Sequence, residues 1–288
     1  MDRDRNGIYL VIDGNNSRNG ITDRLKAAVG LYYIAKTNGI PFRFIHTAGF
    51  DLRDYLVPKE TDWTAELSDL SANPGKVRKI SYYPPFGDAG IAFRRDMQYV
   101  CRDYIGKNYL EMTGVPDWQA VWRKLFLELF APSGQVLRDL KNDPGEEHYA
   151  VVNARFINAL GVFEDAGYNA PFPPETQEKI IEAVLRKAEA CREDAGEPVI
   201  LYSDSVRFLK EAEKRGFRIC DTEGVGHIMN PDVSERVILK TFVNFFAMAN
   251  ADRIYSILNV EGIPENSLYK TQYPRYAAIV GGKPFIRI

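Results

Sequence analysis

Four polar loops hold the residues whose types and spacing could do chemistry. They cover residues 15–20, 153–155, 203–205 and 268–275. Each loop follows a predicted strand or precedes a predicted helix, and in an open α/β sheet ligands bind beyond the carboxyl ends of the strands. None of them contains a G-x-G-x-x-G fingerprint, a Walker loop or a G-x-S-x-G elbow. The chemistry must therefore be inferred from individual side chains.

Two of these loops are suited to binding an anion. Arg155 comes directly after the predicted strand 149–152. An arginine there can fork two N–H donors onto a diphosphate, in charge-assisted hydrogen bonds worth roughly 1.5–3 kcal/mol each. In loop 268–275, Lys270 supplies charge, Thr271 a hydroxyl, and the helix that follows a partly positive N-terminus. A surface salt bridge at Arg155 and a plain helix cap at Thr271 are the alternatives.

The other two loops suit either a ligand or a local turn. Asn16, Arg18 and Gly20 precede a predicted helix whose first N–H groups can bind an anion or a sugar hydroxyl. An ordinary turn with an N-cap explains the same residues. Ser203 and Asp204 stand where a base or a ribose could be held, and capping of the next helix is the simpler explanation there.

The composition excludes several classes of function. Lys and Arg number 37 and Asp and Glu 39, so the formal charge of −2 leaves no basic excess for a nucleic-acid backbone. The three cysteines and three histidines are scattered without metal-ligand spacing, so we expect no metal site and no disulfide framework. We find no run of about 18 apolar residues and no signal-peptide pattern. We therefore expect a cytoplasmic protein with at most peripheral membrane contact.

The first half of the chain predicts a parallel sheet followed by less regular structure. Strand 8–12, helix 22–36 and strand 42–45 form a βαβ opening. Prolines and glycines between residues 51 and 88 predict irregular surface structure. We expect two helices after it, over residues 92–104 and 117–130.

The second half alternates strands and helices more regularly, which predicts a doubly wound parallel sheet. A polar break at 141–147 has the turn chemistry expected between units, so we divide the chain into domains 1–145 and 146–288. The strands are expected at 149–152, 199–202, 253–257 and 284–286, and the helices at 173–188, 206–214, 231–249 and 273–280.

Taken in order, these segments resemble the fucosyltransferase superfamily of the GT-B fold, the group that includes nodulation and core-fucosylating enzymes. The sequence N-G-I-T-D-R-L-K-A at 19–27 resembles the family's N-terminal "G-x-G-[DN]-R-L" helix. V-V-N-A-R at 151–155 is similar to the "H-x-R" motif, whose arginine binds the β-phosphate of GDP in that family. L-Y-S-D-S at 201–205 resembles the "T-D" strand end near the guanosine. Segments 248–254 and 271–278 resemble the "S-x-A-D" and "S-[SQ]-F-S-x-x-A" motifs, so the resemblance touches most of the chain.

The resemblance implies two Rossmann-like domains, an N-terminal one on the acceptor side and a C-terminal one that binds a nucleotide sugar. It implies an inverting transfer of fucose from GDP-fucose to a hydroxyl of a glycan or glycolipid, without a metal or another cofactor. Arg155, Lys270 and the helix after Thr271 would then stabilise the leaving diphosphate in place of a cation. Gln272, beside Thr271, joins this expected binding set.

Departures from the family pattern leave the donor and the catalytic base open. Asn153 stands where the family has histidine, and Asn244, which we keep in the binding set, where it has an acid. An inverting transfer needs a carboxylate near the acceptor hydroxyl. Glu164 is the nearest counterpart of the family's proposed base, so it is our candidate. A catalytically inactive GT-B-like protein that binds a nucleotide or glycan is one alternative, and a transferase that uses another nucleotide sugar is the second.

Four aromatic residues and one histidine complete the candidates. Trp63, Tyr82, Tyr83 and Phe86 could stack on sugar faces of an acceptor, although aromatic side chains lie more often in a hydrophobic core. His227 lies in a glycine-containing loop that could cover a cleft.

Overall fold

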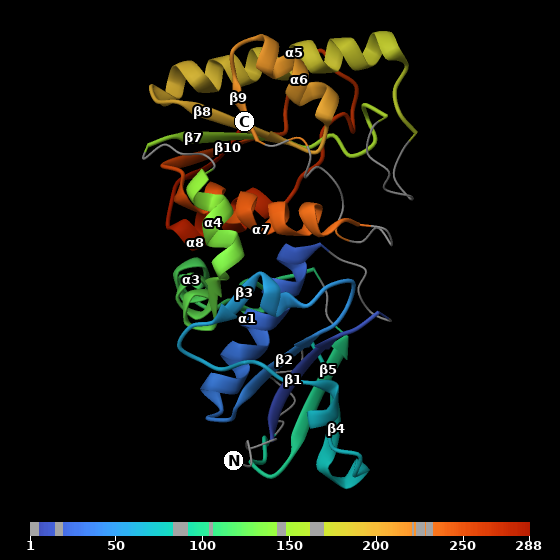
Figure 1. The fold of residues 1–288 in the computed structure, drawn as a ribbon, viewed down its shortest axis with the longest axis vertical. Coiled ribbons are helices and arrows are strands. Elements are labelled where there is room, and N and C mark those ends of the chain that lie inside the picture. Colours follow the sequence, from blue (N-terminus) through green and yellow to red (C-terminus); the bar gives the residue numbers. More distant parts are fainter. Residues whose placement is uncertain are drawn as a thin grey trace. The chain divides into compact units, whose positions relative to one another are not determined.

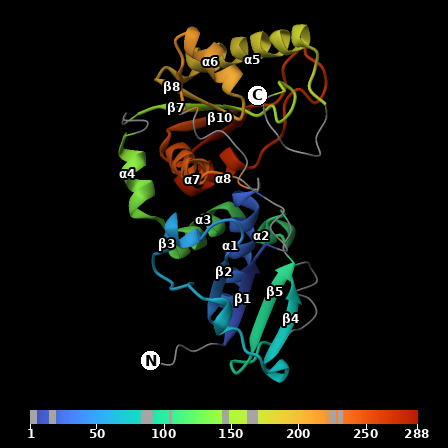
Figure 2. The ribbon, with the colours of Figure 1, turned by 45° about the vertical axis from the view of Figure 1, so that its right-hand side comes forward.

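The chain forms two compact units, Met1–Ser133 and Gly134–Ile288. Figures 1 and 2 show the computed structural model from two directions. It describes residues 6–14, 20–82, 92–103, 106–142, 148–161, 170–220, 222, 228 and 233–288.

The two units divide before helix α4 (Gly134–Asn142), whereas the sequence suggested a division at residue 145. Helix α4 packs on helix α7 (Glu235–Asn250), which belongs to the second unit. An ion pair of 3.0 Å between Arg236 and Asp139 joins the two helices. Residues 143–147, which hold most of the expected break, lie outside the described residues.

The first unit contains a four-stranded parallel sheet in the order β2-β1-β5-β4. All six residues of the central strand β1 are buried, as a strand with neighbours on both sides requires. Helix α1 (Ile21–Thr37) packs on β1 and β2, which confirms the predicted βαβ opening. The strands are β1 (Gly7–Ile12), β2 (Phe42–His46), β4 (Val77–Ser81) and β5 (Gln98–Asp103).

The predicted helix at 92–104 is wrong, because its second half is strand β5. Residues 98–101 are buried and pair with both β1 and β4, and these contacts are distant in sequence. Within the stretch expected to be irregular, the described residues 51–82 hold β3 (Leu56–Pro58), β4 and three single turns of 3-10 helix. Strand β3 pairs antiparallel with β6 (Phe130–Pro132). The short helical elements are η1 (Leu52–Asp54), η2 (Leu67–Asp69), η3 (Pro74–Lys76), α2 (Tyr109–Met112) and α3 (Trp118–Leu129).

The second unit contains a five-stranded parallel sheet in the order β11-β10-β7-β8-β9. Helices α5 (Pro174–Ala195) and α6 (Val206–Lys214) cover one face, and α7 and α8 (Tyr273–Gly281) cover the other, as both ribbon views show. The predicted doubly wound parallel sheet is confirmed. Its strands are β7 (Ala150–Ala154), β8 (Val199–Ser203), β9 (Arg218–Ile219), β10 (Arg253–Ile257) and β11 (Phe285–Arg287).

Close packing holds α7 and α8 against each other under this sheet. A Cβ atom at Gly281 would lie 2.0 Å from the carbonyl oxygen of Ala249, so only glycine fits at this contact. The Tyr149 hydroxyl donates a 2.6 Å hydrogen bond to the carbonyl of Ala247 in α7. Because side chains alternate along a strand, Val151 and Asn153 share this face of the sheet with Tyr149.

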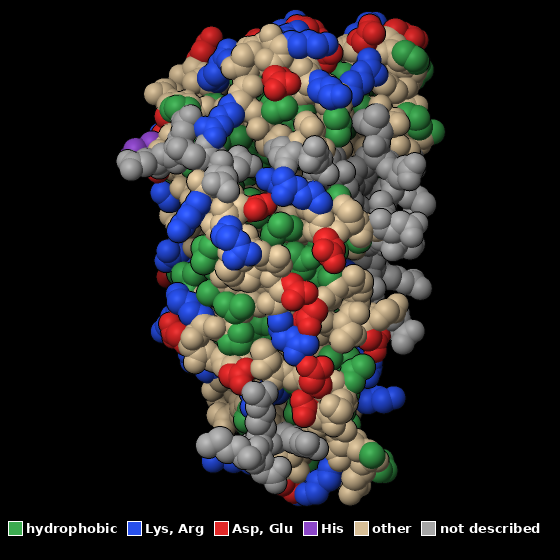
Figure 3. All heavy atoms as spheres, viewed as in Figure 1, with side chains coloured by type: hydrophobic (Ala, Val, Ile, Leu, Met, Phe, Trp, Pro, Cys, Tyr) green, Lys and Arg blue, Asp and Glu red, His purple; other side chains and the backbone are tan. Residues whose placement is uncertain are grey.

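Charged side chains of both signs are interspersed on the surface. In the face drawn in Figure 3, Lys and Arg lie among Asp and Glu and do not form a field of one sign. Among the helices that the structure describes, none is long and apolar enough to cross a membrane.

Candidate functional site

The order of strands in the second sheet marks one place for a ligand. From β7 the chain proceeds outward through β8 and β9, and it then returns to the other side of β7 with β10 and β11. In such sheets the crevice for a ligand lies beyond the carboxyl ends of the two strands where the order reverses. Here these are β7, followed by Arg155, and β10, followed by Leu258.

The loops after β7 and β10 contact each other at Arg155. The Tyr269 N–H donates a 2.7 Å hydrogen bond to the carbonyl oxygen of Arg155. The guanidinium carbon of Arg155 also lies 5.8 Å from the centre of the Tyr269 ring, within the range of a cation–π contact. The structure therefore brings together two loops that the sequence proposed separately as anion sites. Tyr269 itself was missed, although its position beside Lys270 was a signal.

Arg155 has a carboxylate partner and remains accessible. Its Nε lies 3.8 Å from Oδ2 of Asp204, and its side chain is 25% exposed. At 3.8 Å this contact is an ion pair and not a hydrogen bond, and a guanidinium has five N–H donors, so the contact is compatible with a bidentate partner such as a phosphate. Arg155 is thus a partly exposed cation at the switch point of the sheet.

Asp204 binds the main chain of the loop that follows β7. Its two carboxylate oxygens accept hydrogen bonds of 2.8 Å from the N–H groups of Phe156 and Ile157. Capping of α6 is carried out by Ser205, whose Oγ accepts from the Phe208 N–H at 3.2 Å. The cap expected of loop 203–205 is therefore present, but Ser205 makes it and Asp204 does not. Burial raises the pKa of Asp204, against the opposing effects of Arg155 and the two N–H groups.

The loop held by Asp204 has a strained backbone. Ile157 has a φ of 51°, in the left-handed region that β-branched residues rarely adopt. Such a conformation costs on the order of 1–3 kcal/mol and persists only where neighbouring contacts impose it. The hydrogen bond from Ile157 to Asp204 is one such contact.

Two asparagines of the predicted site contain buried acceptor atoms. Asn153 is 8% exposed, and its Nδ2 lies 3.5 Å from the carbonyl oxygen of Tyr202. Within the part of the chain that the structure describes, Oδ1 of Asn153 and Oδ1 of Asn244 are buried without a hydrogen-bond partner. Leaving a buried acceptor unsatisfied costs about 1–3 kcal/mol. The cost would be recovered if a ligand donated a hydrogen bond to it.

Three of the remaining residues of this set directly precede α8, and the fourth, Ser203, ends β8. The Thr271 side chain accepts a 3.2 Å hydrogen bond from the N–H of Tyr273, the first residue of α8, whereas the N-cap itself is Gln272, which makes no side-chain cap. Lys270 is exposed directly before it. Gln272 lies 3.5 Å from Arg275, and the Ser203 hydroxyl accepts from the Ser205 N–H at 3.2 Å.

Several candidates lie elsewhere. Gly20 belongs to the first unit, where it precedes α1 and offers no side chain. Trp63 and Tyr82 are at most 1% exposed, so their proposed stacking on sugars is wrong: both belong to the hydrophobic core. Asn16, Arg18, Glu164, Tyr83, Phe86 and His227 fall outside the described residues.

A buried arginine–histidine pair, which the sequence reasoning missed, lies in the first unit. Arg24 is 1% exposed and donates a 2.7 Å hydrogen bond to Nε2 of His46. The other ring nitrogen of His46 lies 3.1 Å from the Phe50 carbonyl oxygen. Burial and the charge of Arg24 lower the pKa of His46 to about 3, so the imidazole is neutral at pH 7. A neutral imidazole can accept from Arg24 and donate to Phe50.

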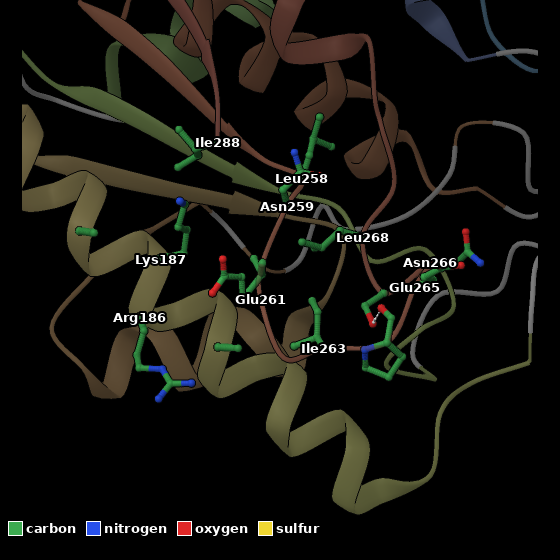
Figure 4. A pocket seen from close by; sticks show the side chains of 15 residues that line it. Arg186, Lys187, Leu258, Asn259, Glu261, Ile263, Glu265, Asn266, Leu268 and Ile288 are labelled. Atoms are coloured by element: carbon green, nitrogen blue, oxygen red, sulfur yellow. Dashed lines mark hydrogen bonds between the residues drawn. The ribbon is translucent and has the colours of Figure 1, made fainter.

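A cavity of about 930 Å³ lies between α5 and the segment that follows β10 (Figure 4). Arg186 and Lys187 of α5 line it, together with Glu261 and Glu265 of the facing segment. Its charged side chains are balanced in sign, and none of the predicted site residues lines it. This cavity therefore offers no excess of positive charge to an anion, and an anion site at Arg155 stays a prediction.

The sequence matches no protein-family model and no curated protein. Solved structures similar to this chain include the alpha-1,6-fucosyltransferase NodZ co-crystallised with GDP, with 11% identity and a TM-score of 0.56. That match covers 94% of this chain and 91% of the other. NodZ soaked with GDP-fucose matches with 11% identity and a TM-score of 0.54, over 96% of this chain and 92% of the other.

A third similar structure is selenomethionine NodZ from Bradyrhizobium, with 12% identity and a TM-score of 0.53, over 94% of this chain and 91% of the other. At this identity the match establishes the fold. The chain has a GT-B-like fucosyltransferase fold, as the resemblance of its motifs implied.

Proposed function

We propose that the protein is a glycosyltransferase that binds a nucleoside diphosphate sugar at the carboxyl edge of its second sheet. GDP-fucose is the first candidate donor, because structures with this fold were obtained with GDP and with GDP-fucose. The acceptor would be a hydroxyl of a glycan or glycolipid, held on the side of the first unit.

The position of Arg155 is the observation that carries this proposal. It lies at the switch point of the sheet, partly exposed and attached to the loop after β10 through Tyr269. Negative charge develops on the diphosphate as the sugar leaves, and fixed donors aimed at that charge lower the barrier. Arg155, Lys270 and the N-terminus of α8 would supply this stabilisation without a divalent cation. The buried Oδ1 of Asn153 would accept a hydrogen bond from a donor group of the nucleotide sugar.

Transfer with inversion also requires a base for the acceptor hydroxyl, and we propose Glu164. General-base catalysis contributes about 10²–10⁴ to the rate, so Glu164→Gln should lower kcat by at least about 100-fold in a transfer assay. The matched control is Glu178→Gln, at an exposed position of α5, which should retain the rate. Full activity of Glu164→Gln would remove the assignment.

A nucleotide panel tests the proposed function directly. Thermal unfolding is measured with GDP, UDP and CDP at equal concentrations, since a ligand present at 100 times its Kd stabilises by about 2.7 kcal/mol. GDP should raise Tm the most, and transfer or hydrolysis of GDP-fucose should follow in an activity assay. A larger shift with UDP or CDP would indicate another donor, and no shift with any nucleotide would reject the proposal.

The second candidate function is a GT-B-like binding protein without catalytic activity. The observation that favours it is the presence of Asn153 and Asn244 where the family pattern has histidine and an acid, because an amide cannot carry charge. Tight GDP binding without turnover of GDP-fucose or another GDP-sugar would support this candidate.

A further inference from the structure

We propose that Asp204 is the positioning residue of the nucleotide edge: it fixes the loop after β7 and aims the Arg155 guanidinium, without touching the nucleotide itself. This inference rests on the proposed function for its ligand. It differs from the role suggested by the sequence, where Asp204 was expected to contact the nucleotide.

The hydrogen bonds of Asp204 account for both of its oxygens. Oδ1 accepts from the Phe156 N–H and Oδ2 from the Ile157 N–H, each at 2.8 Å, and the side chain is only 10% exposed. A carboxylate bound to two consecutive backbone N–H groups fixes the orientation of that peptide. Both carboxylate oxygens of Asp204 therefore face the protein backbone and not solvent.

The location of this contact explains why it matters for Arg155. Phe156 and Ile157 directly follow Arg155, and Ile157 has the left-handed φ of 51°. Without the Asp204 carboxylate, the hydrogen bond that holds Ile157 in this conformation would be lost. The backbone at Ile157 could then relax to a commoner φ. Arg155 is held on its other side by Tyr269, through a main-chain hydrogen bond and the ring. Asp204 and Tyr269 therefore hold Arg155 between the two loops of the switch point.

Charge and position make opposite predictions for a variant at Asp204. A negative charge 3.8 Å from Nε of Arg155 weakens the attraction of the guanidinium for a phosphate, so a purely electrostatic role predicts tighter GDP binding in Asp204→Asn. A positioning role predicts weaker binding, because Arg155 loses its orientation. The direction of the change separates the two.

The test is a double-mutant cycle of Asp204→Asn and Arg155→Ala, with GDP affinity measured by calorimetry. We expect Asp204→Asn to lower the affinity for GDP about tenfold. The double variant should bind GDP no more weakly than Arg155→Ala alone. The matched control is Ser234→Ala, which removes the serine cap of α7 outside the four candidate loops and should leave GDP affinity within about twofold. Tighter or unchanged binding by Asp204→Asn, or losses that simply add, would overturn the inference.

A second measurement needs no ligand and separates failure of this inference from failure of the proposed function. Amide hydrogen exchange at Phe156 and Ile157 should accelerate at least about tenfold in Asp204→Asn and remain unchanged in Ser234→Ala. If wild type does not bind GDP, the proposed function fails, while protected amides that depend on Asp204 would still support the positioning role. Unchanged exchange would overturn it. If Asp204→Asn does not fold, Asp204→Glu keeps the charge and displaces the carboxylate. Weaker GDP binding and faster amide exchange in Asp204→Glu would then support the positioning role, and no change in either would overturn it.

Discussion

The two units each contain an arginine near the end of a parallel strand, and the two arginines have different partners. Arg24 is 1% exposed and donates to a neutral histidine at the end of β2, with its guanidinium 5.7 Å from the Phe50 ring. The Arg155 side chain is 25% exposed and faces a carboxylate that is itself bound to the backbone. The first arrangement encloses the cation in the fold, whereas the second presents it to solvent. On this comparison Arg24 has the contacts of a structural arginine, and the partly exposed Arg155 is the one that we propose binds a ligand.

The largest expected effect is on stability, at Arg24. Arg24→Ala would leave a cavity and remove the donor to buried His46, so the free energy of unfolding should fall by about 3 kcal/mol or more. Urea denaturation measures this, with Arg155→Ala as the comparison, which should lose less than about 1 kcal/mol. Equal losses of unfolding free energy in Arg24→Ala and Arg155→Ala would contradict the distinction between a buried structural arginine and an accessible one.

The next effect is a pH dependence that arises in the first unit. The pKa of His46 is about 3 in the folded state and near its ordinary 6.5 when unfolded, so only the unfolded state takes up a proton between these values. Stability should therefore fall as pH drops below 6.5, by about 2 kcal/mol between pH 7 and pH 5. His46→Gln removes this titration while keeping an acceptor for Arg24. If the variant showed the same pH slope as wild type, another group would be responsible.

Arg155 should control nucleotide binding and not stability. Arg155→Ala should lower the affinity for GDP or kcat/KM at least tenfold, which corresponds to about 1.4 kcal/mol. Arg155→Lys should recover part of the loss, because lysine keeps the charge without the bidentate fork. The control is Arg186→Ala, an exposed arginine that lines the separate cavity beside α5 and should bind GDP normally. A loss at Arg186 that equalled the loss at Arg155 would move the anion site to that cavity.

The smallest expected effect is at Lys270. Its exposed ammonium acts through solvent, so Lys270→Ala should lower the affinity for GDP only about two- to fivefold. This loss of affinity should be smaller at higher salt, which screens the charge. Affinities measured at about 50 mM and 300 mM salt test this, with Lys214→Ala in α6 as the control. A loss that does not change with salt would mean that Lys270 contacts the nucleotide more closely than its exposure implies.

Most of the secondary structure in the second unit could be predicted from the sequence, because short apolar strands alternate there with long amphipathic helices. The predicted strand 253–257 coincides with β10, and the helix predicted from residue 273 begins there in α8. The prediction failed at β5, since Gln98 to Cys101 adopt a strand through pairing with β1 and β4, which lie far away in sequence. Local pattern cannot report such pairing.

The sequence by itself determined which residue types stand at the carboxyl ends of the strands, among them Arg155, Asp204 and Thr271. Only the tertiary structure decided what each of them contacts. Parallel pairing of β7 with β8 sets Ala154 beside Ser203, and this register brings Asp204 to the N–H groups of residues 156 and 157. Residues 48 and 47 positions apart meet there because two strands share a sheet, and hydrogen bonding between strands leaves no periodic signal in the sequence.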